Sequence, residues 1–282
     1  MFHVVLASIP ICILGTIFNS LCFSFFIRRR NKRLGDQLLL LLNILDISVC
    51  ISGTITASLY FYLIAHRHST HLDRSYWVFT VVFSTGLSGT AFATCLLSFT
   101  RTIAMCFPFY KINRRYILFS ILLFLLLQTV RQIVFAVNDK SEQGKIIQKY
   151  VGIIGIILLL LIIVSVLVSN TVSIVKLRAN TYQWKVKKID TSKSRLRSNR
   201  RHATVTVITL SVVFCILNSL YISGYMVNLH LGKGEELPFY HYTVWLFIPL
   251  NSVLNPVVYF ARKRGVRSFM SRQLRSLSRA VI

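Results

Sequence analysis

The chain has 282 residues, of which 54% are hydrophobic and only 15% are charged, and its formal net charge is +25. A typical soluble domain is about 25% charged, so this much apolar surface cannot be buried inside one soluble core of this length. The large positive charge is also typical of a nucleic-acid binder, and only its distribution along the chain can distinguish that class from others.

The apolar residues are gathered in runs of membrane-spanning length, because about 20 apolar residues cross a hydrocarbon layer of about 30 Å. The run containing GIIGIILLLLIIVSVLV (152–168) has no polar face, whereas a helix on the surface of a soluble protein would be amphipathic. The first run lacks the basic region and cleavage site of a signal peptide, so we expect it to be retained. We predict an all-α membrane protein, with a bundle of seven transmembrane helices in residues 1–261. The predicted helices cover residues 4–27, 38–65, 77–105, 117–137, 150–176, 204–228 and 239–261.

The basic residues alternate between the two ends of the predicted helices. Of the 33 Lys and Arg residues, 26 follow the odd-numbered helices or end the third, and six follow the even-numbered ones. The positive-inside rule then places the N-terminus outside the cell and the C-terminus in the cytoplasm. We therefore expect a multi-pass protein of the plasma membrane whose positive charge faces the anionic inner leaflet. The same distribution argues against a nucleic-acid partner.

The six cysteines all lie in or at the ends of the predicted helices, so we expect no disulfide in an outer loop. The sequence contains no nucleotide-binding loop and no cluster of metal ligands. No histidine lies in the middle of a helix, and no nucleophile and base are paired at depth, as an intramembrane enzyme would require. We therefore expect neither enzymatic activity nor an organic cofactor.

Polar side chains at membrane depth are informative because each needs a partner inside the bundle. Asp46 is the only acid within any predicted helix, and a charged side chain at the bilayer centre costs from about 3 to over 10 kcal/mol. It is either a protonated residue that only joins helices or part of a hydrated cluster that can hold a cation. The other polar residues singled out at depth are Asn19, Thr90, Ser98, Asn251, Ser252 and Asn255.

Two helix ends carry further motifs. The last predicted helix contains LNSVLNPVVY (250–259), where Pro256 removes one backbone hydrogen bond and bends the helix. The third ends in SFTRTIAMCFPFY (98–110), in which Arg101 is either a simple membrane anchor or a functional contact. The first and second helices contain GTIFNSL (15–21) and LNILD (42–46).

Together these four motifs, in this order, resemble the rhodopsin-like (class A) G-protein-coupled receptors. The resemblance implies a two-state bundle in which an extracellular ligand favours outward movement of the sixth helix, and a heterotrimeric G protein binds the opened cytoplasmic cleft. It implies that Arg101 contacts the G protein, that Tyr259 rotates inward on activation and that Pro256 gives the last helix its bend. It also implies a pocket that holds water and a sodium ion, around Asn19, Asp46, Thr90, Asn251, Ser252 and Asn255.

The sequence departs from this family at several switch positions. Thr100 replaces the acid that normally restrains the arginine, and a neutral hydrogen bond is weaker than a charge-assisted one. We therefore expect raised basal activity or a different restraint on Arg101. In the sixth helix the motif C-W-x-P becomes CILN (215–218), with Ile216 in place of the tryptophan and Asn218 in place of the proline. The family's disulfide cysteines are also missing.

The predicted outer tail is about three residues long, so we expect a small ligand that binds among the helices. The alternative for the aromatic candidates is a belt at the outer membrane interface. Arg131, past the middle of the fourth predicted helix, either pairs with an acidic ligand or extends to the outer surface. The candidate pocket residues are Phe83, Leu87, Tyr221, Tyr225, Tyr242 and Trp245.

Two cytoplasmic segments complete the prediction. Residues 262–282 are expected to form an amphipathic helix at the membrane surface. A basic loop over 177–203 is expected beside the G-protein cleft. The apolar face of the amphipathic helix would contain Val266, Phe269, Met270, Leu274 and Leu277.

Two other classes remain open. One is a receptor-like protein with the same helices that does not couple to G proteins. The other is a transporter, although a transporter would need broken helices in two corresponding halves of the chain, and only one obvious proline break is present.

Overall fold

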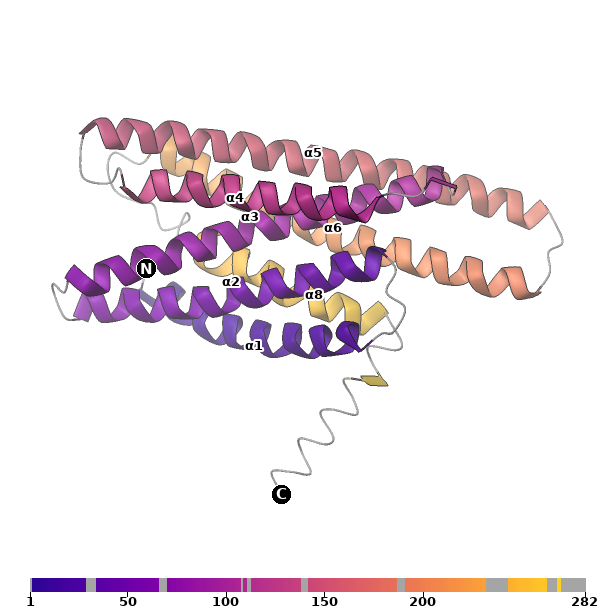
Figure 1. Ribbon diagram of the computed structural model, residues 1–282, viewed down its shortest axis with the longest axis horizontal. Coiled ribbons are helices and arrows are strands. Elements are labelled where there is room, and N and C mark those ends of the chain that lie inside the picture. Colours follow the sequence, from indigo (N-terminus) through magenta and orange to yellow (C-terminus); the bar gives the residue numbers. More distant parts are fainter. Residues whose placement is uncertain are drawn as a thin grey trace, which may run out of the picture.

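The computed structural model describes residues 2–28, 34–65, 70–107, 109–110, 113–137, 142–186, 191–231, 243–262 and 268–269. The described residues are almost entirely helical, which confirms the all-α prediction. The helices run side by side along the length of the molecule (Figure 1). They are α1 (Phe2–Ile27), α2 (Leu34–Ala65), α3 (Thr70–Cys106), α4 (Arg114–Val137), α5 (Glu142–Val186), α6 (Thr191–Leu231), the π-helical turn η1 (Thr243–Phe247) and α8 (Ile248–Arg262).

Within the described residues, the six helices α1 to α6 are long and apolar enough to cross a membrane, and Trp245–Ala261 forms a shorter apolar helix. Their outer faces are apolar as well: Leu122, Leu126 and Val175 are each at least 60% exposed. A soluble protein rarely exposes so large an apolar surface, whereas lipid covers it at no cost. The chain therefore has the fold of a multi-pass membrane protein.

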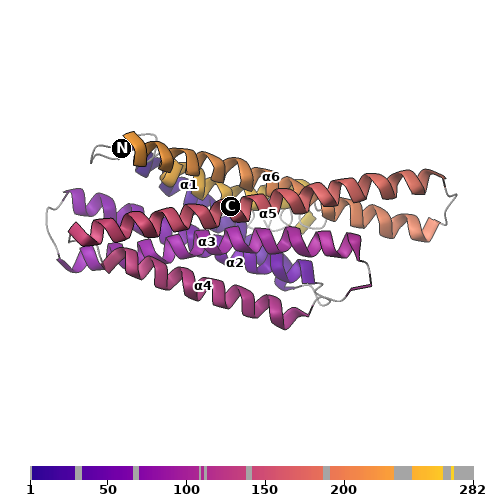
Figure 2. The same ribbon diagram turned by 90° about the horizontal axis from the view of Figure 1, so that it is seen from above.

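Most helices extend beyond the apolar runs that predicted them, because a helix can continue into water after its apolar segment ends. The largest difference concerns the expected loop over 177–203. That expectation is wrong for most of its length, since α5 continues to Val186 and α6 already begins at Thr191. The two helices project together beyond the rest of the bundle (Figures 1 and 2).

Successive helices are neighbours in space, and α8 closes the arrangement by packing against α1 and α6. Helix α3 is central, since it contacts α2, α4, α5 and α6. One buried cluster joins Phe26 of α1, Leu39 of α2, Leu97 of α3, Leu210 of α6 and Tyr259 of α8. The interior is therefore assembled from segments far apart in sequence.

The predicted amphipathic helix lies largely outside the described residues, and so do Val266, Met270, Leu274 and Leu277. Phe269 is described. Its ring packs 5.7 Å from the ring of Phe25, and the guanidinium of Arg28 lies 5.6 Å from its centroid. This contact holds Phe269 against the C-terminal end of α1.

Candidate functional site: a polar seam and a cavity between the helices

Five buried polar residues from α1, α2 and α8 form what we call the polar seam: Asn19, Asp46, Asn251, Ser252 and Asn255. Asn255 Nδ2 donates a hydrogen bond of 2.7 Å to Asp46 Oδ2, which joins α8 to α2. Asn19 Nδ2 donates to the backbone carbonyl of Ser252 at 2.9 Å, which joins α1 to α8. Two hydrogen bonds therefore hold three helices together around the one acid in the predicted spans.

Pro256 explains why Asn19 bonds to a backbone carbonyl. The carbonyl of Ser252 lies four residues before Pro256, and a proline has no N–H with which to satisfy it. The amide of Asn19 supplies that missing donor from the neighbouring helix. A proline in a membrane helix is tolerated where another helix satisfies the freed carbonyl in this way.

Several oxygens of the polar seam are buried and have no hydrogen-bond partner among the described residues. They are Asn19 Oδ1, Asp46 Oδ1, Asn251 Oδ1 and Ser252 Oγ. Oxygens of this kind are normally satisfied by buried water, and hard cations also take oxygen ligands. The described residues contain no group of three His, Cys, Asp or Glu side chains that could hold a metal ion. The donor set therefore fits water or a monovalent cation better than a transition metal.

Thr90 is buried, but its hydroxyl bonds within its own helix, to the carbonyl of Leu87 at 2.8 Å. Tyr259 is fully buried and packs edge-to-face on Phe26, with their ring centroids 5.8 Å apart. Its hydroxyl has no partner in the described part of the chain. The structure thus places Tyr259 inside the bundle, on the side of α1.

Arg101 lies near the C-terminal end of α3 and packs against the start of α2. A Cβ atom on Gly35 would be 2.6 Å from Arg101 Nη2 and 3.2 Å from Cζ. The next residue, Asp36, is 9% exposed. Thr100, which replaces the family's acid, is buried, and its hydroxyl donates to the carbonyl of Leu97 in its own helix at 3.1 Å.

Hydroxyl groups connect α3 to its neighbours near Arg101. Thr102 Oγ1 donates to the carbonyl of Ser169 on α5 at 2.8 Å and lies 2.9 Å from Ser173 Oγ. Ser98 and Ser211 are both buried, and their hydroxyls are 2.8 Å apart across α3 and α6. The Ser98–Ser211 bond holds α6 close to α3, so it can restrain an outward movement of α6.

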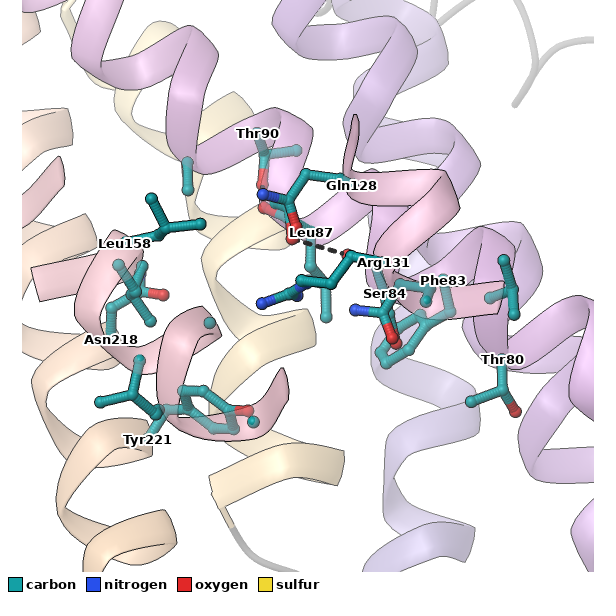
Figure 3. Close-up of a pocket in the computed structure, with 18 of the residues that line it drawn as sticks. Thr80, Phe83, Ser84, Leu87, Thr90, Gln128, Arg131, Leu158, Asn218 and Tyr221 are labelled. Atoms are coloured by element: carbon teal, nitrogen blue, oxygen red, sulfur yellow. Dashed lines mark hydrogen bonds between the residues drawn. The ribbon is translucent and has the colours of Figure 1, made fainter. Parts of the chain in front are cut away.

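A cavity of about 410 Å³ lies between α2, α3, α4, α5, α6 and the segment η1–α8 (Figure 3). It lies toward the end of the bundle at which α3 and α5 begin. Five of the six predicted pocket residues line it, and the sixth, Tyr242, lies outside the described residues. The rings of Phe83 and Trp245 stack with their centroids 6.3 Å apart and an interplanar angle of 13°. The predicted residues that line the cavity are Phe83, Leu87, Tyr221, Tyr225 and Trp245.

The cavity and the polar seam share a boundary, because Asn251 belongs to the seam and also lines the cavity. Thr90 lines the cavity beside it. A molecule in the cavity can therefore contact the seam directly.

Ile216, which stands in place of the family's tryptophan, does not face the interior of the bundle. It is 57% exposed, whereas Phe214 is 1% exposed and lines the cavity. Residues two apart in an α-helix differ by about 200° around its axis, so they face nearly opposite sides. The aromatic side chain on α6 beside the cavity is therefore Phe214, two residues before Ile216. Asn218, one turn after Phe214, faces the cavity as well.

Arg131 lines the cavity rather than extending to the outer surface, and Gln128, one turn earlier on α4, lies beside it (Figure 3). Gln128 is only 5% exposed. Gln128 and Arg131 are polar residues in a largely apolar helix, and their spacing of three residues could have predicted that they share one face.

No protein-family model matches the chain, and no curated protein matches it. The likeness to rhodopsin-like receptors therefore rests on the motifs and on the contacts that their residues make.

Proposed function

We propose that the chain is a rhodopsin-like receptor of the plasma membrane, with seven transmembrane helices and an extracellular N-terminus. In this proposal it converts the binding of a small extracellular ligand into activation of a heterotrimeric G protein. The observation that carries the proposal is the Asn255–Asp46 hydrogen bond of 2.7 Å, formed beside the carbonyl that Pro256 frees and Asn19 satisfies. Motif residues from three helices, each weak evidence alone, meet in one buried seam.

The route from ligand to cytoplasm follows the described contacts. A ligand in the cavity contacts Thr90 and Asn251. The polar seam beyond them contacts α8 beside Pro256, through the hydrogen bond from Asn19 to the Ser252 carbonyl. A change in the bend of α8 would act on Tyr259, which packs in the cluster that also contains Leu210 of α6. Release of the Ser98–Ser211 bond would then allow α6 to move outward and leave Arg101 free to contact the G protein. A ligand drives such a change only if it binds one of the two states more tightly.

The polar seam has a supporting role in this scheme. Asp46, Asn251 and Ser252 would hold a sodium ion through their unpartnered oxygens. A bound cation would supply positive charge beside the buried carboxylate. Because any ion or water there must rearrange when α8 moves, the occupancy of the seam would favour the state that it fits.

The membrane contacts follow from the charge distribution. The projecting ends of α5 and α6 belong to the segment that carries ten of the basic residues, from Lys176 to Arg201. In the proposed orientation these residues lie at the cytoplasmic side, where each basic residue near an anionic leaflet contributes about 1 kcal/mol of attraction. They also border the surface that a G protein would approach.

The decisive experiment measures activation of each Gα class in cells that express the full chain with a surface tag, both without ligand and with a ligand panel. We expect activation of at least one class, and we expect Arg101→Ala to abolish it while surface expression is maintained. A chain that reaches the surface but activates no Gα class, basally or with any ligand, would be the receptor-like protein without coupling. An unchanged response of Arg101→Ala would remove that residue from the proposed role.

A further inference from the structure

We propose that the cavity recognises a small aromatic carboxylic acid and that Arg131 binds its carboxylate. The inference deepens the proposed receptor function and rests on it for its physiological meaning. The binding itself, however, can be measured without any signalling.

Helix α5 has a glycine where the guanidinium of Arg131 approaches its backbone. A Cβ atom on Gly155 would overlap Arg131 Nη1, so no other residue fits there without displacing the arginine. One turn earlier, a Cβ on Gly152 would overlap the hydroxyl of Tyr225. Two glycines three residues apart thus form a notch in which the guanidinium of α4 and a phenol of α6 both approach the backbone of α5.

Among the described residues that line the cavity, Arg131 is the only one with a formal charge at neutral pH, and none of them is Asp or Glu. Its Nε is buried and has no hydrogen-bond partner among the residues that the structure describes. An ionic group removed from water without a partner is strongly unfavourable. A carboxylate can supply two parallel hydrogen bonds to a guanidinium, which makes it the natural complement of this site.

Other polar groups surround the same position. The phenols of Tyr221 and Tyr225 lie within electrostatic range of the guanidinium, and each can donate its O–H to an anionic oxygen. Gln128 is buried, and its Oε1 has no partner in the described chain. Because the amide can present either its oxygen or its nitrogen, it can donate to the same carboxylate or accept from a neighbouring donor.

The remaining wall is aromatic and apolar, and it determines the rest of the ligand. The stacked rings of Phe83 and Trp245, with Phe214 and Leu87, form surfaces on which a flat ring can pack. Ligand cavities usually measure about 300–1,000 Å³, so a volume of about 410 Å³ suits a small molecule. A single or fused aromatic ring that carries a short acidic side chain satisfies both parts of the site.

The test measures thermal stabilisation of the purified full-length protein in lipid nanodiscs. The probes are phenylacetate, 3-phenylpropionate, indole-3-acetate and indole-3-propionate, each paired with its primary amide, which has the same shape and no charge. We expect one or more of the acids to raise the Tm in a saturable manner, while the matched amide binds at least about tenfold more weakly, as loss of a charged hydrogen-bond partner implies.

The variant Arg131→Gln should weaken binding of that acid by about tenfold or more and leave binding of the amide unchanged. Arg131→Lys should retain part of the preference for the acid, because it keeps the charge without the planar geometry. Arg115→Gln is the matched control, since Arg115 is an exposed arginine near the start of the same helix. Without ligand, Arg131→Gln should unfold at a higher temperature than the natural chain, because it removes a partly buried charge whose Nε has no hydrogen-bond partner among the described residues.

The inference is overturned if the natural chain binds none of the acids, or if it binds acids and amides equally. It is also overturned if Arg131→Gln keeps the preference, or if that variant alone loses stability without ligand, as a purely structural arginine would predict. These results are independent of signalling. Arg131-dependent acid binding by a chain that activates no G protein would reject the proposed function and support this site. G-protein activation by a chain that binds none of the acids would support the proposed function and reject this site.

Discussion

The guanidinium of Arg101 on α3 lies against Gly35 at the start of α2, so close that a Cβ atom on Gly35 would be 2.6 Å from Nη2. Thr100 does not take part in this contact, because its hydroxyl bonds to Leu97 in its own helix. The neighbour that faces Arg101 in this structure is therefore the beginning of α2, where the buried Asp36 follows Gly35.

Gly35→Ala should raise basal G-protein activation several-fold, because the added methyl group displaces Arg101 from its position against α2. The measurement is ligand-independent activation normalised to surface expression. Gly89→Ala is the matched control: its methyl group would also meet a neighbour closely, at 2.7 Å from Leu125 Cδ2, but far from Arg101. Equal basal activity in the two variants would show that the contact with Gly35 does not restrain Arg101.

Thr100→Asp should lower basal activation, because a carboxylate beside Arg101 can form a charge-assisted hydrogen bond that threonine cannot. Thr100→Asn provides a neutral side chain of nearly the same shape and should leave the basal level close to that of the natural chain. The same assay compares all three. A fall in both variants, or in neither, contradicts the view that the missing charge sets the basal level.

Ser211→Ala should increase basal activation by about threefold. Hydrogen bonds between membrane helices contribute about 0.6 kcal/mol on average, and that free energy corresponds to a factor of about three in a two-state equilibrium. The bond lost is the 2.8 Å contact with Ser98 that ties α6 to α3. Ser165→Ala is the control, since its exposed hydroxyl bonds only within its own helix. No change in basal output on Ser211→Ala would exclude this bond as a restraint.

The relationship between Asn19 and Pro256 can be measured with a double-mutant cycle on thermal unfolding. Asn19→Leu should destabilise the natural chain by about 1–3 kcal/mol, because the Ser252 carbonyl is left buried without a donor. In a Pro256→Ala background, the alanine N–H satisfies that carbonyl within α8, so the same substitution should cost less. Additive effects of the two substitutions would show that the amide of Asn19 does not compensate for the proline.

Phe214 and Ile216 offer a direct test of which residue on α6 faces the interior. Phe214→Ala should lower the stability of the purified protein by about 3–5 kcal/mol, the usual cost of removing a buried aromatic ring. Ile216→Ala should change it by less than about 1 kcal/mol, because the side chain is 57% exposed. Thermal unfolding in nanodiscs measures both variants. A larger loss of stability for Ile216→Ala than for Phe214→Ala would show that Ile216, and not Phe214, faces the interior.

The sequence predicted the helices well because lipid requires long apolar segments, and such segments are visible in a single chain. It predicted their ends less well. The segment 177–203 was expected to be a loop because it is basic, but polarity does not end a helix when no proline or glycine interrupts it. Helices α5 and α6 therefore continue to Val186 and from Thr191.

The polar side chains show the same limit at the level of single residues. Pairing Asp46 with Asn255 needed only the motifs and the cost of burying a charge in lipid. The motif match placed Ile216 where the family has tryptophan, but it could not show that the buried aromatic side chain of α6 beside the cavity is Phe214. The spacing of Gln128 and Arg131 could have predicted that they share one face of α4, but the close approach of Arg131 to α5 depends on Gly155 of that other helix.

The continuous form of α6 makes it a lever. Thr191 and Ser211 belong to the same helix, and at 1.5 Å per residue they are about 30 Å apart. If α6 turns about its contact with Ser98, a rotation of about 10° moves its N-terminal end by about 5 Å, close to the length of one helical turn. A small rearrangement of hydroxyl groups within the membrane would thus be magnified mechanically before it reaches any partner outside.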